Sequence, residues 1–225
     1  MPNFDIVRTS KLDNTFRVAK VKSDFDFQKD EISERFKGEI SLPDQWNIGL
    51  IVGNSGTGKT TIARELFGED IVDGYEYNCP SVIDDMPKGC SVDDITKTFY
   101  AVGFGSVPSW LKPYHVLSNG EKMRVDVARS ILGRDFTVFD EFTSVVDRDV
   151  AKTLCVAVAK SIRRSGKKFV AVSCHKDIIE YLQPDWVFDT DKMQCFFPSA
   201  RDLNGSSRFE NAGARNGRSL ASIII

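Results

Sequence analysis

The feature that most constrains this chain is the stretch GNSGTGKTT, residues 53–61, which follows the apolar run WNIGLIV. A simple turn needs one or two glycines and has no use for a lysine held just before two hydroxyl residues. The spacing Gly53-x-x-x-x-Gly58-Lys59-Thr60 is typical of a phosphate-binding loop between a buried strand and a helix. The sequence therefore predicts a site for a nucleoside triphosphate at the end of a strand.

Within this loop, backbone amides are expected to converge on the phosphate chain. Lys59 reaches the outer phosphates and is a candidate catalytic residue, and the hydroxyl group of Thr60 is a candidate ligand of Mg²⁺. The loop residues expected to bind the nucleotide are Gly53, Asn54, Ser55, Gly56, Thr57, Gly58, Lys59, Thr60 and Thr61.

Composition excludes several other classes of protein. The 225 residues carry a formal net charge of −2, so the chain as a whole shows no strongly basic surface for nucleic acid, and local basic patches stay open. No apolar stretch is long enough to cross a bilayer and the first residues do not resemble a signal sequence, which predicts a cytoplasmic protein. Five cysteines without a C-x-x-C pair indicate neither a disulfide framework nor a zinc site.

Helical and strand patterns alternate along the chain. Residues 15–22 (TFRVAKVK) and 36–42 (FKGEISL) are expected to form strands ahead of the loop strand. Helices are expected near 58–67, 93–103, 119–132 and 148–164 and shortly after Lys176, with strands at 136–140, 169–173 and 186–189. Strands separated by helices indicate an α/β fold with a mostly parallel sheet covered by helices.

A change of composition marks the end of this domain. Residues 1–195 are expected to form the domain, and residues 196–225, rich in Ser, Gly, Asn and Arg, a flexible tail. The alternative is a peripheral strand that docks through the final apolar residues SIII.

Residues 116–132, VLSNGEKMRVDVARSIL, begin with a pattern that caps a helix. Ser118 is a good N-cap, and Glu121 three residues later would complete a capping box, which is a purely architectural explanation. The N-terminus of the helix that follows is also a ready site for an anion such as a γ-phosphate. Taken alone, the stretch supports both explanations equally.

The apolar strand before residue 140 ends in two adjacent acids, Asp140 and Glu141. Such a pair requires a compensating charge, because burying unpaired carboxylates is costly, and Mg²⁺ would supply it. Asp140 is placed to hold the metal, directly or through water, and Glu141 to orient or deprotonate the attacking water.

Together these motifs resemble those of the ABC class of ATPases. LSNGE at 117–121 takes the place of the family's LSGGQ signature, VFDEFTSVVDR resembles its Walker B strand and D-loop, and His175 stands where the family has a switch histidine that contacts the γ-phosphate. Phe142 departs from the family, which commonly has proline there. The resemblance implies an ATP-binding and ATP-hydrolysing enzyme in which Glu141 and His175 are catalytic. The further nucleotide-binding residues that it implies are Ser118, Asn119, Gly120, Glu121 and Asp147.

The resemblance also implies a head-to-tail homodimer with two ATP molecules in its interface. The phosphate loop can enclose only one side of the triphosphate, so Ser118 and Gly120 are expected to meet the other protomer's nucleotide. Phe25 or Phe27 is a candidate to stack on adenine, with packing in the core as the alternative. A guanine-reading N-K-x-D motif is missing from the sequence, which favours ATP over GTP.

Two departures separate the chain from the transporter branch of this class. The stretch from Ile62 to Leu117 lacks the glutamine through which transporters couple ATP to their membrane subunits, and the segment before the signature is short. SVIDDMP stands in place of that glutamine, so Asp84 or Asp85 is expected either to contact metal or water or to lie in an exposed turn.

A more specific likeness covers about residues 15–195. LPDQWNIGLIVGNSGTGKTTIARELF, WLKPYHVLSNGEKMR and YLQPDWVFD resemble the ATPase half of ABC proteins fused to a GNAT-type acetyltransferase in bacteria and phages. The favoured expectation is a soluble ABC ATPase, without membrane insertion of its own, that drives a nucleic-acid or modification-related partner. The alternatives are a nucleotide-binding subunit of an ABC membrane transporter and a binding protein that does not hydrolyse ATP.

Overall fold

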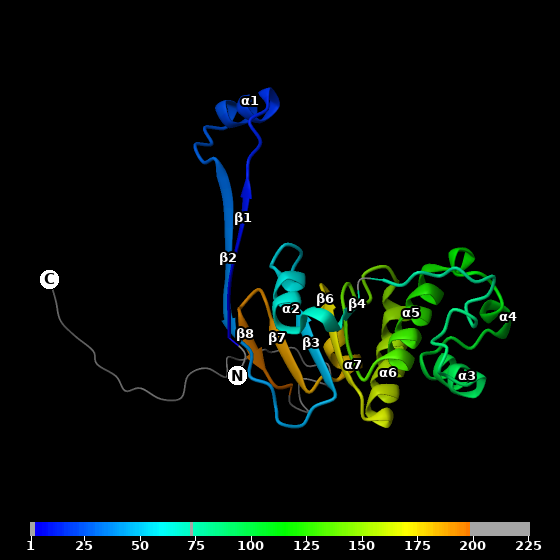
Figure 1. Cartoon of the computed structure of the whole chain (residues 1–225). Helices are drawn as coiled ribbons and strands as arrows, with labels where there is room; N and C mark the ends of the chain where they lie inside the picture. The colour runs from blue at the N-terminus through cyan, green and yellow to red at the C-terminus, as the bar shows by residue number, and fades with distance from the viewer. Residues whose placement is uncertain (1–2, 73, 199–225) are drawn as a thin grey trace, which may run out of the picture.

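The computed structural model describes residues 3–72 and 74–198. Its central sheet has the strand order β4-β5-β6-β3-β7-β8 (Figure 1). The strands are β3 (Ile48–Val52), β4 (Ile71–Val72), β5 (Phe136–Phe139), β6 (Lys168–Ser173), β7 (Trp186–Asp189) and β8 (Gln194–Phe196). All pairs are parallel except that of β7 with β8. The predicted fold class, an α/β fold with a mostly parallel sheet covered by helices, is confirmed.

The helices agree closely with the sequence pattern. They are α2 (Lys59–Phe67), α3 (Val92–Ala101), α4 (Val107–Trp110), α5 (Asn119–Gly133), α6 (Arg148–Ser165) and α7 (Ile178–Leu182), with 3-10 turns η1 (Gly68–Asp70) and η2 (Tyr114–Val116). The strands β4 and β8 and the helix α4 were not predicted, because elements of two to four residues are too short to show a period.

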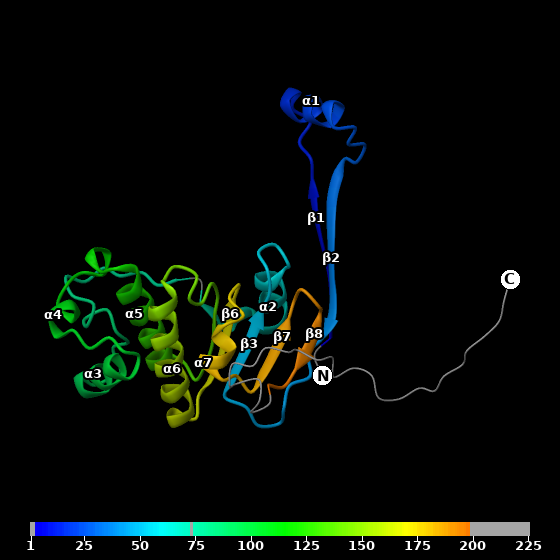
Figure 2. The same cartoon turned by 180° about the vertical axis from the view of Figure 1, so that it is seen from behind.

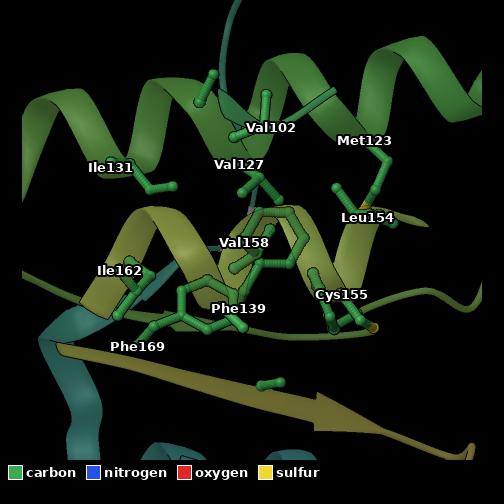
Figure 3. Packing of buried hydrophobic residues seen from close by; sticks show 14 of the residues in the cluster. Val102, Met123, Val127, Ile131, Phe139, Leu154, Cys155, Val158, Ile162 and Phe169 are labelled. Carbon is green, nitrogen blue, oxygen red and sulfur yellow. The ribbon is translucent and has the colours of Figure 1, made fainter. Parts of the chain in front are cut away.

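Each inner strand buries both faces, which is why it appears in the sequence as a continuous apolar run. In β3, Leu50 faces the helices α5 and α6, whereas Ile51 faces α2 and packs with Ile62. Figure 3 shows the first of these layers, in which Val127 of α5 and Val158 of α6 lie over the sheet. The two cores hold the sheet rigidly, so that the strand ends can position a site.

Between β4 and α5 the chain forms a small helical region that is tied to α5 by one partly buried carboxylate. Asp126 accepts hydrogen bonds of 2.7 Å from the hydroxyl groups of both Tyr77 and Tyr114, whose rings stack 3.8 Å apart. Burial raises the pKa of Asp126, although both hydrogen bonds oppose the shift. This network joins the segment after β4 and the segment before α5 to the same residue of α5.

The first residues form an arm, which we define as residues 3–39. Its strands β1 (Asn3–Lys11) and β2 (Glu31–Glu39) pair antiparallel from Asn3 with Glu39 to Lys11 with Glu31, and α1 (Phe16–Asp24) lies at its tip. Figures 1 and 2 show α1 well clear of every element outside the arm.

The prediction of a strand over residues 15–22 is wrong, because these residues form most of α1. The hydroxyl group of Thr15 accepts the amide of Val18 and caps the helix, and Lys20 pairs with Asp24 one turn later. The ladder of β1 with β2 ends at Lys11 and Glu31, so residues 15–22 lie beyond it in the connection between the two strands. The second predicted strand, 36–42, is correct only up to Glu39, where β2 ends.

At its other end the described chain runs two residues past β8, to Pro198. The predicted flexible tail, apart from its first three residues, lies outside the described residues. Among the residues that are described, no helix is both long and apolar enough to cross a membrane.

Candidate functional site

The predicted phosphate-binding loop joins the carboxyl end of β3 to the N-terminus of α2. Gly56 and Gly58 have left-handed φ angles of 82° and 83°, which favour glycine. A Cβ on Gly58 would also lie 2.5 Å from the ring of Phe36 in β2, so this position excludes a side chain on two grounds. The loop is therefore shaped by the arm as well as by its own sequence.

Hydrogen bonds inside the loop fix the position of its lysine. The Nζ of Lys59 and the hydroxyl of Thr57 both donate to the carbonyl of Asn54, at 2.8 and 2.9 Å. Ser55 and Gly56 are exposed at the crest of the loop, and Thr60 and Thr61 begin α2. The first amides of α2 have no acceptor inside the helix, which makes this end a site for an anion.

Thr190 and Asp191, which the sequence did not indicate, contact the loop through hydrogen bonds. The hydroxyl groups of Thr190 and Thr57 lie 2.6 Å apart, and the carboxylate of Asp191 accepts the amide of Asn54 at 2.9 Å. A Cβ on Gly53 would lie 2.1 Å from the Thr190 hydroxyl. The only available signal was their place directly after the buried strand β7, which neighbours β3.

Lys176 links these residues to the end of β6. Its Nζ lies 2.8 Å from the carboxylate of Asp189 and 2.9 Å from that of Asp191. Burial would lower the pKa of Lys176, but the two carboxylates outweigh it and raise the pKa. The amide of Asn54 and the ammonium group of Lys176 lower the pKa of Asp191, so the carboxylate stays ionised beneath the loop.

The acidic pair follows β5, two strands away from β3 in the same sheet. Asp140 accepts the amide of Glu141 at 2.9 Å, and Glu141 has a left-handed φ of 52° and is exposed. Its carboxylate accepts the hydroxyl of Ser144. The backbone turn therefore directs the Glu141 side chain away from the core.

Phe142, which follows this acidic pair, makes a contact that explains why proline does not stand at this position. The amide of Phe142 donates to the carbonyl of Val172 at 2.8 Å, a bond that proline cannot make. The Phe142 ring is fully buried and packs edge-on against Phe139 and Phe169. Phe142 thus ties the acidic turn to β6.

His175 lies between the loop and the acidic pair. It follows β6, the strand between β5 and β3, and Ser173 at the end of β6 pairs with Val52 just before the loop. The amide of His175 donates to the hydroxyl of Ser173 at 3.2 Å. The three predicted catalytic residues, Lys59, Glu141 and His175, therefore share one edge of the sheet.

The signature residues belong to a second group. The capping box is present: Ser118 accepts the amide of Glu121, and Glu121 accepts the amide and hydroxyl of Ser118. Ser118 and Asn119 are exposed, and a Cβ on Gly120 would lie 3.3 Å from Val150 of α6.

Asp147 lies at the start of α6 and caps it by accepting the amide of Val150 at 2.9 Å. Since Val150 also approaches Gly120, the signature residues and Asp147 are neighbours. The capping contacts explain why these residues stand at the starts of α5 and α6. The role of the signature residues and of Asp147 in nucleotide binding stays a prediction.

Glu121 also accepts the hydroxyl of Ser109 at 2.7 Å. The hydrogen bonds from Ser109 and Ser118 lower the pKa of Glu121, and the bond from Ser109 has the largest effect. A carboxylate whose pKa is lower in the folded state stabilises the fold at pH values above its unfolded pKa of about 4.3. This stabilisation is lost as the pH falls through the folded pKa. We expect Glu121→Gln to reduce the free energy of unfolding most at pH 7, with the deficit shrinking towards pH 3.5.

Urea unfolding at a series of pH values measures this. Ser109→Ala, which keeps the carboxylate but removes one donor, is the control and should show a smaller deficit of the same sign. A deficit that is equal at pH 7 and pH 3.5 would contradict the linkage.

The candidate adenine-stacking residues lie at the tip of the arm. Phe25 is 79% exposed, so its alternative role in the core is wrong. The arm touches the loop at Phe36 of β2. From Phe36 to Glu31, where β2 begins next to the tip, the strand spans five residues, or about 17 Å. This placement disfavours stacking of Phe25 or Phe27 on a base held by the loop.

Asp84 and Asp85 have partners within their own turn. Asp84 accepts the hydroxyl of Ser81, and Asp85 accepts the amides of Asn78 and Cys79. These bonds account for both carboxylates as turn-forming residues, and contact of either with metal or water stays a prediction.

Comparison of the chain with protein-family models and with curated proteins finds no match. Among solved structures it is similar to the dimeric cassette of a bacterial ABC transporter, MJ0796, with a TM-score of 0.54, 13% identity and coverage of 69% of this chain and 87% of that one. The same cassette bound to ADP and Pi in a post-hydrolysis state gives 0.57 at 11% identity, covering 83% and 92%. A bacterial Atm1-family ABC exporter with ATP bound gives 0.50 at 18% identity, covering 71% and 34%. The chain therefore has the fold of an ABC ATP-binding cassette.

Proposed function

We propose that this protein is an ATPase that binds Mg-ATP at the phosphate loop and hydrolyses it in a head-to-tail homodimer. The observation that carries the proposal is the meeting of Lys59, Glu141 and His175 at one edge of the sheet, where β3, β5 and β6 end. The ABC cassette fold supports it, because structures of that fold were solved with ATP, or with ADP and Pi.

Each residue at this edge has a distinct task in the proposal. The loop amides and Lys59 hold the phosphates, Glu141 orients and deprotonates the attacking water, and His175 contacts the γ-phosphate. The Thr60 hydroxyl and the Asp140 carboxylate are oxygen donors of the kind that Mg²⁺ prefers, and we assign them as its ligands. The metal would neutralise charge on the transferred phosphate.

Dimerisation follows from the division of the site into two groups. The loop group lies at the ends of β3, β5 and β6, whereas Gly120, two residues after Ser118, lies against Val150 at the start of α6. Ser118 is exposed at the N-terminus of α5, an end that favours an anion. A two-fold arrangement would set each signature against the other protomer's loop.

Lys59→Ala tests the nucleotide site itself. We expect the variant to bind Mg-ATP at least about ten-fold more weakly, since the loop loses the one charge that reaches the outer phosphates. Calorimetric titration measures the dissociation constant. Lys88→Ala is a control, because Lys88 is an exposed residue of the helical region. An affinity equal to that of the unmodified protein would remove Lys59 from the site.

For the partner, we propose a soluble nucleic acid or a modification enzyme. The likeness of the motifs to ATPases fused to GNAT-type acetyltransferases supports it. A hollow of about 790 Å³ between α3 and α6 also supports it, since Lys152, Lys160 and Arg164 line it beside Tyr100 and Val156. Lys160 and Arg164 are both exposed, so an anionic partner could reach both charges.

Charge reversal of this hollow tests the nucleic-acid partner. We expect Lys160→Glu/Arg164→Glu to weaken binding of a short DNA duplex at least about ten-fold and to reduce its salt slope by about 2. Fluorescence anisotropy between 50 and 300 mM salt, as a rough working range, measures both. Lys29→Glu/Lys88→Glu is the control for net charge. An unchanged affinity and slope would exclude this face as the nucleic-acid site.

The alternative function, a nucleotide-binding subunit of an ABC membrane transporter, is favoured by the transporter origin of the similar structures. Both functions share the same ATP chemistry and differ in the partner. Affinity capture with Glu141→Gln protein in Mg-ATP separates them: a multi-span membrane protein would support the transporter, and a soluble protein or nucleic acid the other.

A further inference from the structure

The arm turns one of its faces towards the sheet and the loop. Successive side chains of a strand point to opposite faces, so Phe4, Ile6 and Arg8 of β1 share one face. Phe36 of β2 pairs with Ile6 and lies on that face as well. Phe4 packs edge-on against Phe188 of β7, with 5.7 Å between the ring centroids. This face is therefore the one that the arm presents to the rest of the domain.

Contacts on this face place Arg8 at the first turn of α2. The ring of Phe36 lies against Gly58, the residue before the helix. Arg8 stands two residues beyond Ile6, the partner of Phe36, or about 7 Å further along the strand. Its Nη1 donates to the hydroxyl of Thr61 at 2.9 Å. Figures 1 and 2 show the base of the arm beside α2, as these contacts require.

The side chain of Thr61 brings Arg8 close to the start of the helix. Thr61 is the third residue of α2, and the Cα–Cβ bonds of a helix tilt towards its N-terminus. The Thr61 hydroxyl therefore leans towards the free amides of the first turn, where the phosphate chain is proposed to lie. A guanidinium group has five N–H donors, and the bond to Thr61 uses one of them. Arg8 can thus hold Thr61 and a phosphate oxygen at the same time.

The charges at this end of α2 favour an anion. Lys59 and Arg8 meet at the positive end of the helix dipole, and the first turn, which the structure describes in full, contains no acidic residue. Glu34 stands opposite Arg8 in the ladder, but the guanidinium group donates to Thr61. Cations placed in this way repel one another, and an anion bound among them removes the repulsion. A triphosphate would supply that negative charge.

We propose that Arg8 is a further ligand of the nucleotide, supplied by the arm. When Mg-ATP binds to the loop, the guanidinium group keeps its bond to Thr61 and donates to an oxygen of the triphosphate. Its planar set of donors matches the geometry of phosphate. The proposal rests on the ATPase function proposed above, because it needs a nucleotide on the loop. It explains why the arm, whose two strands form a sheet of their own, contacts the start of α2.

Calorimetric titration with Mg-ATP tests this role. Arg8→Gln should raise the dissociation constant at least about ten-fold, because a charge-assisted hydrogen bond to phosphate is lost. Arg8→Lys keeps the charge without the planar donors and should recover part of the affinity. Arg8 is exposed, so both variants should fold.

Arg35→Gln is the matched control. It removes the same charge from the opposite face of the arm, and it breaks a cross-strand contact in which the Nε of Arg35 donates to the carboxylate of Asp5 at 2.7 Å. The control should bind Mg-ATP as the unmodified protein does. It therefore separates phosphate binding by Arg8 from a loosened arm and from a change in net charge.

Hydrogen exchange of the arm gives a readout that does not depend on turnover. A two-stranded hairpin is marginally stable on its own, and a ligand that contacts only the folded arm stabilises it. Saturating Mg-ATP should slow the exchange of backbone amides in β1 and β2 of the unmodified protein, and it should slow them much less in Arg8→Gln.

Three results would overturn this role of Arg8 while Lys59→Ala still loses affinity and the nucleotide site stands. They are an unchanged dissociation constant in Arg8→Gln, an equal loss in Arg35→Gln, and amide exchange in the arm that is the same with and without Mg-ATP. If Lys59→Ala binds Mg-ATP as tightly as the unmodified protein, the proposed site itself fails, and the role of Arg8 fails with it.

Discussion

Glu141→Gln is expected to lower steady-state ATP turnover by at least about 100-fold and to leave Mg-ATP affinity within about two-fold. The amide has the shape of the carboxylate but cannot accept the proton of the attacking water. Glu141 is exposed and contacts Ser144 rather than the core, so the substitution should leave the fold intact. Phosphate release and calorimetric titration measure the two quantities.

Asp149→Asn is the matched control, because Asp149 is an exposed carboxylate in the first turn of the neighbouring helix α6. It should retain normal turnover. Unchanged turnover in Glu141→Gln would mean that another group activates the water, and an equal loss in the control would mean that the charge of this region matters rather than Glu141.

Ser118→Arg is expected to abolish both ATP-dependent dimerisation and turnover while the monomer still binds ATP. The bulky side chain would stand at the exposed N-terminus of α5, where the other protomer's phosphates are proposed to lie. Sedimentation with Mg-ATP and a phosphate-release assay check the two losses.

The same substitution also removes a helix cap, which costs about 1 kcal/mol of stability. Ser91→Arg provides the control, since Ser91 caps α3 by accepting the amide of Asp94 at 3.1 Å. It should lose similar stability and keep dimer and turnover. Normal hydrolysis by Ser118→Arg would contradict the head-to-tail mechanism.

The sequence predicts those parts of the site that depend on neighbouring residues. The loop from Gly53 to Thr60 and the pair Asp140 and Glu141 are short motifs, and the strands before them are apolar runs because both faces are buried. The long helices α5 and α6 have clear periods and caps, and their predicted ends differ from the observed ones by one residue at most.

The residues that the sequence missed depend on contacts between distant segments. Thr190 and Asp191 reach the loop only because β7 lies beside β3, and sequence order does not state that pairing. Phe36 contacts Gly58 for a similar reason, since β2 folds back on the loop. In the arm, Phe16 and Val18 suggested a strand, whereas the local cap at Thr15 determined a helix.

The ion pair between Lys176 and Asp191 connects the end of β6 to the loop between β3 and α2. His175 directly precedes Lys176, and Asp191 joins Lys176 to the amide of Asn54 in the loop. Because of these contacts, a displacement of His175 would shift Asn54 in the loop, and a change in the shape of the loop would shift His175. Such effects are reciprocal in free energy. If the loop and His175 both contact the γ-phosphate, as proposed above, we expect the two contacts to form together, because Lys176 and Asp191 link them.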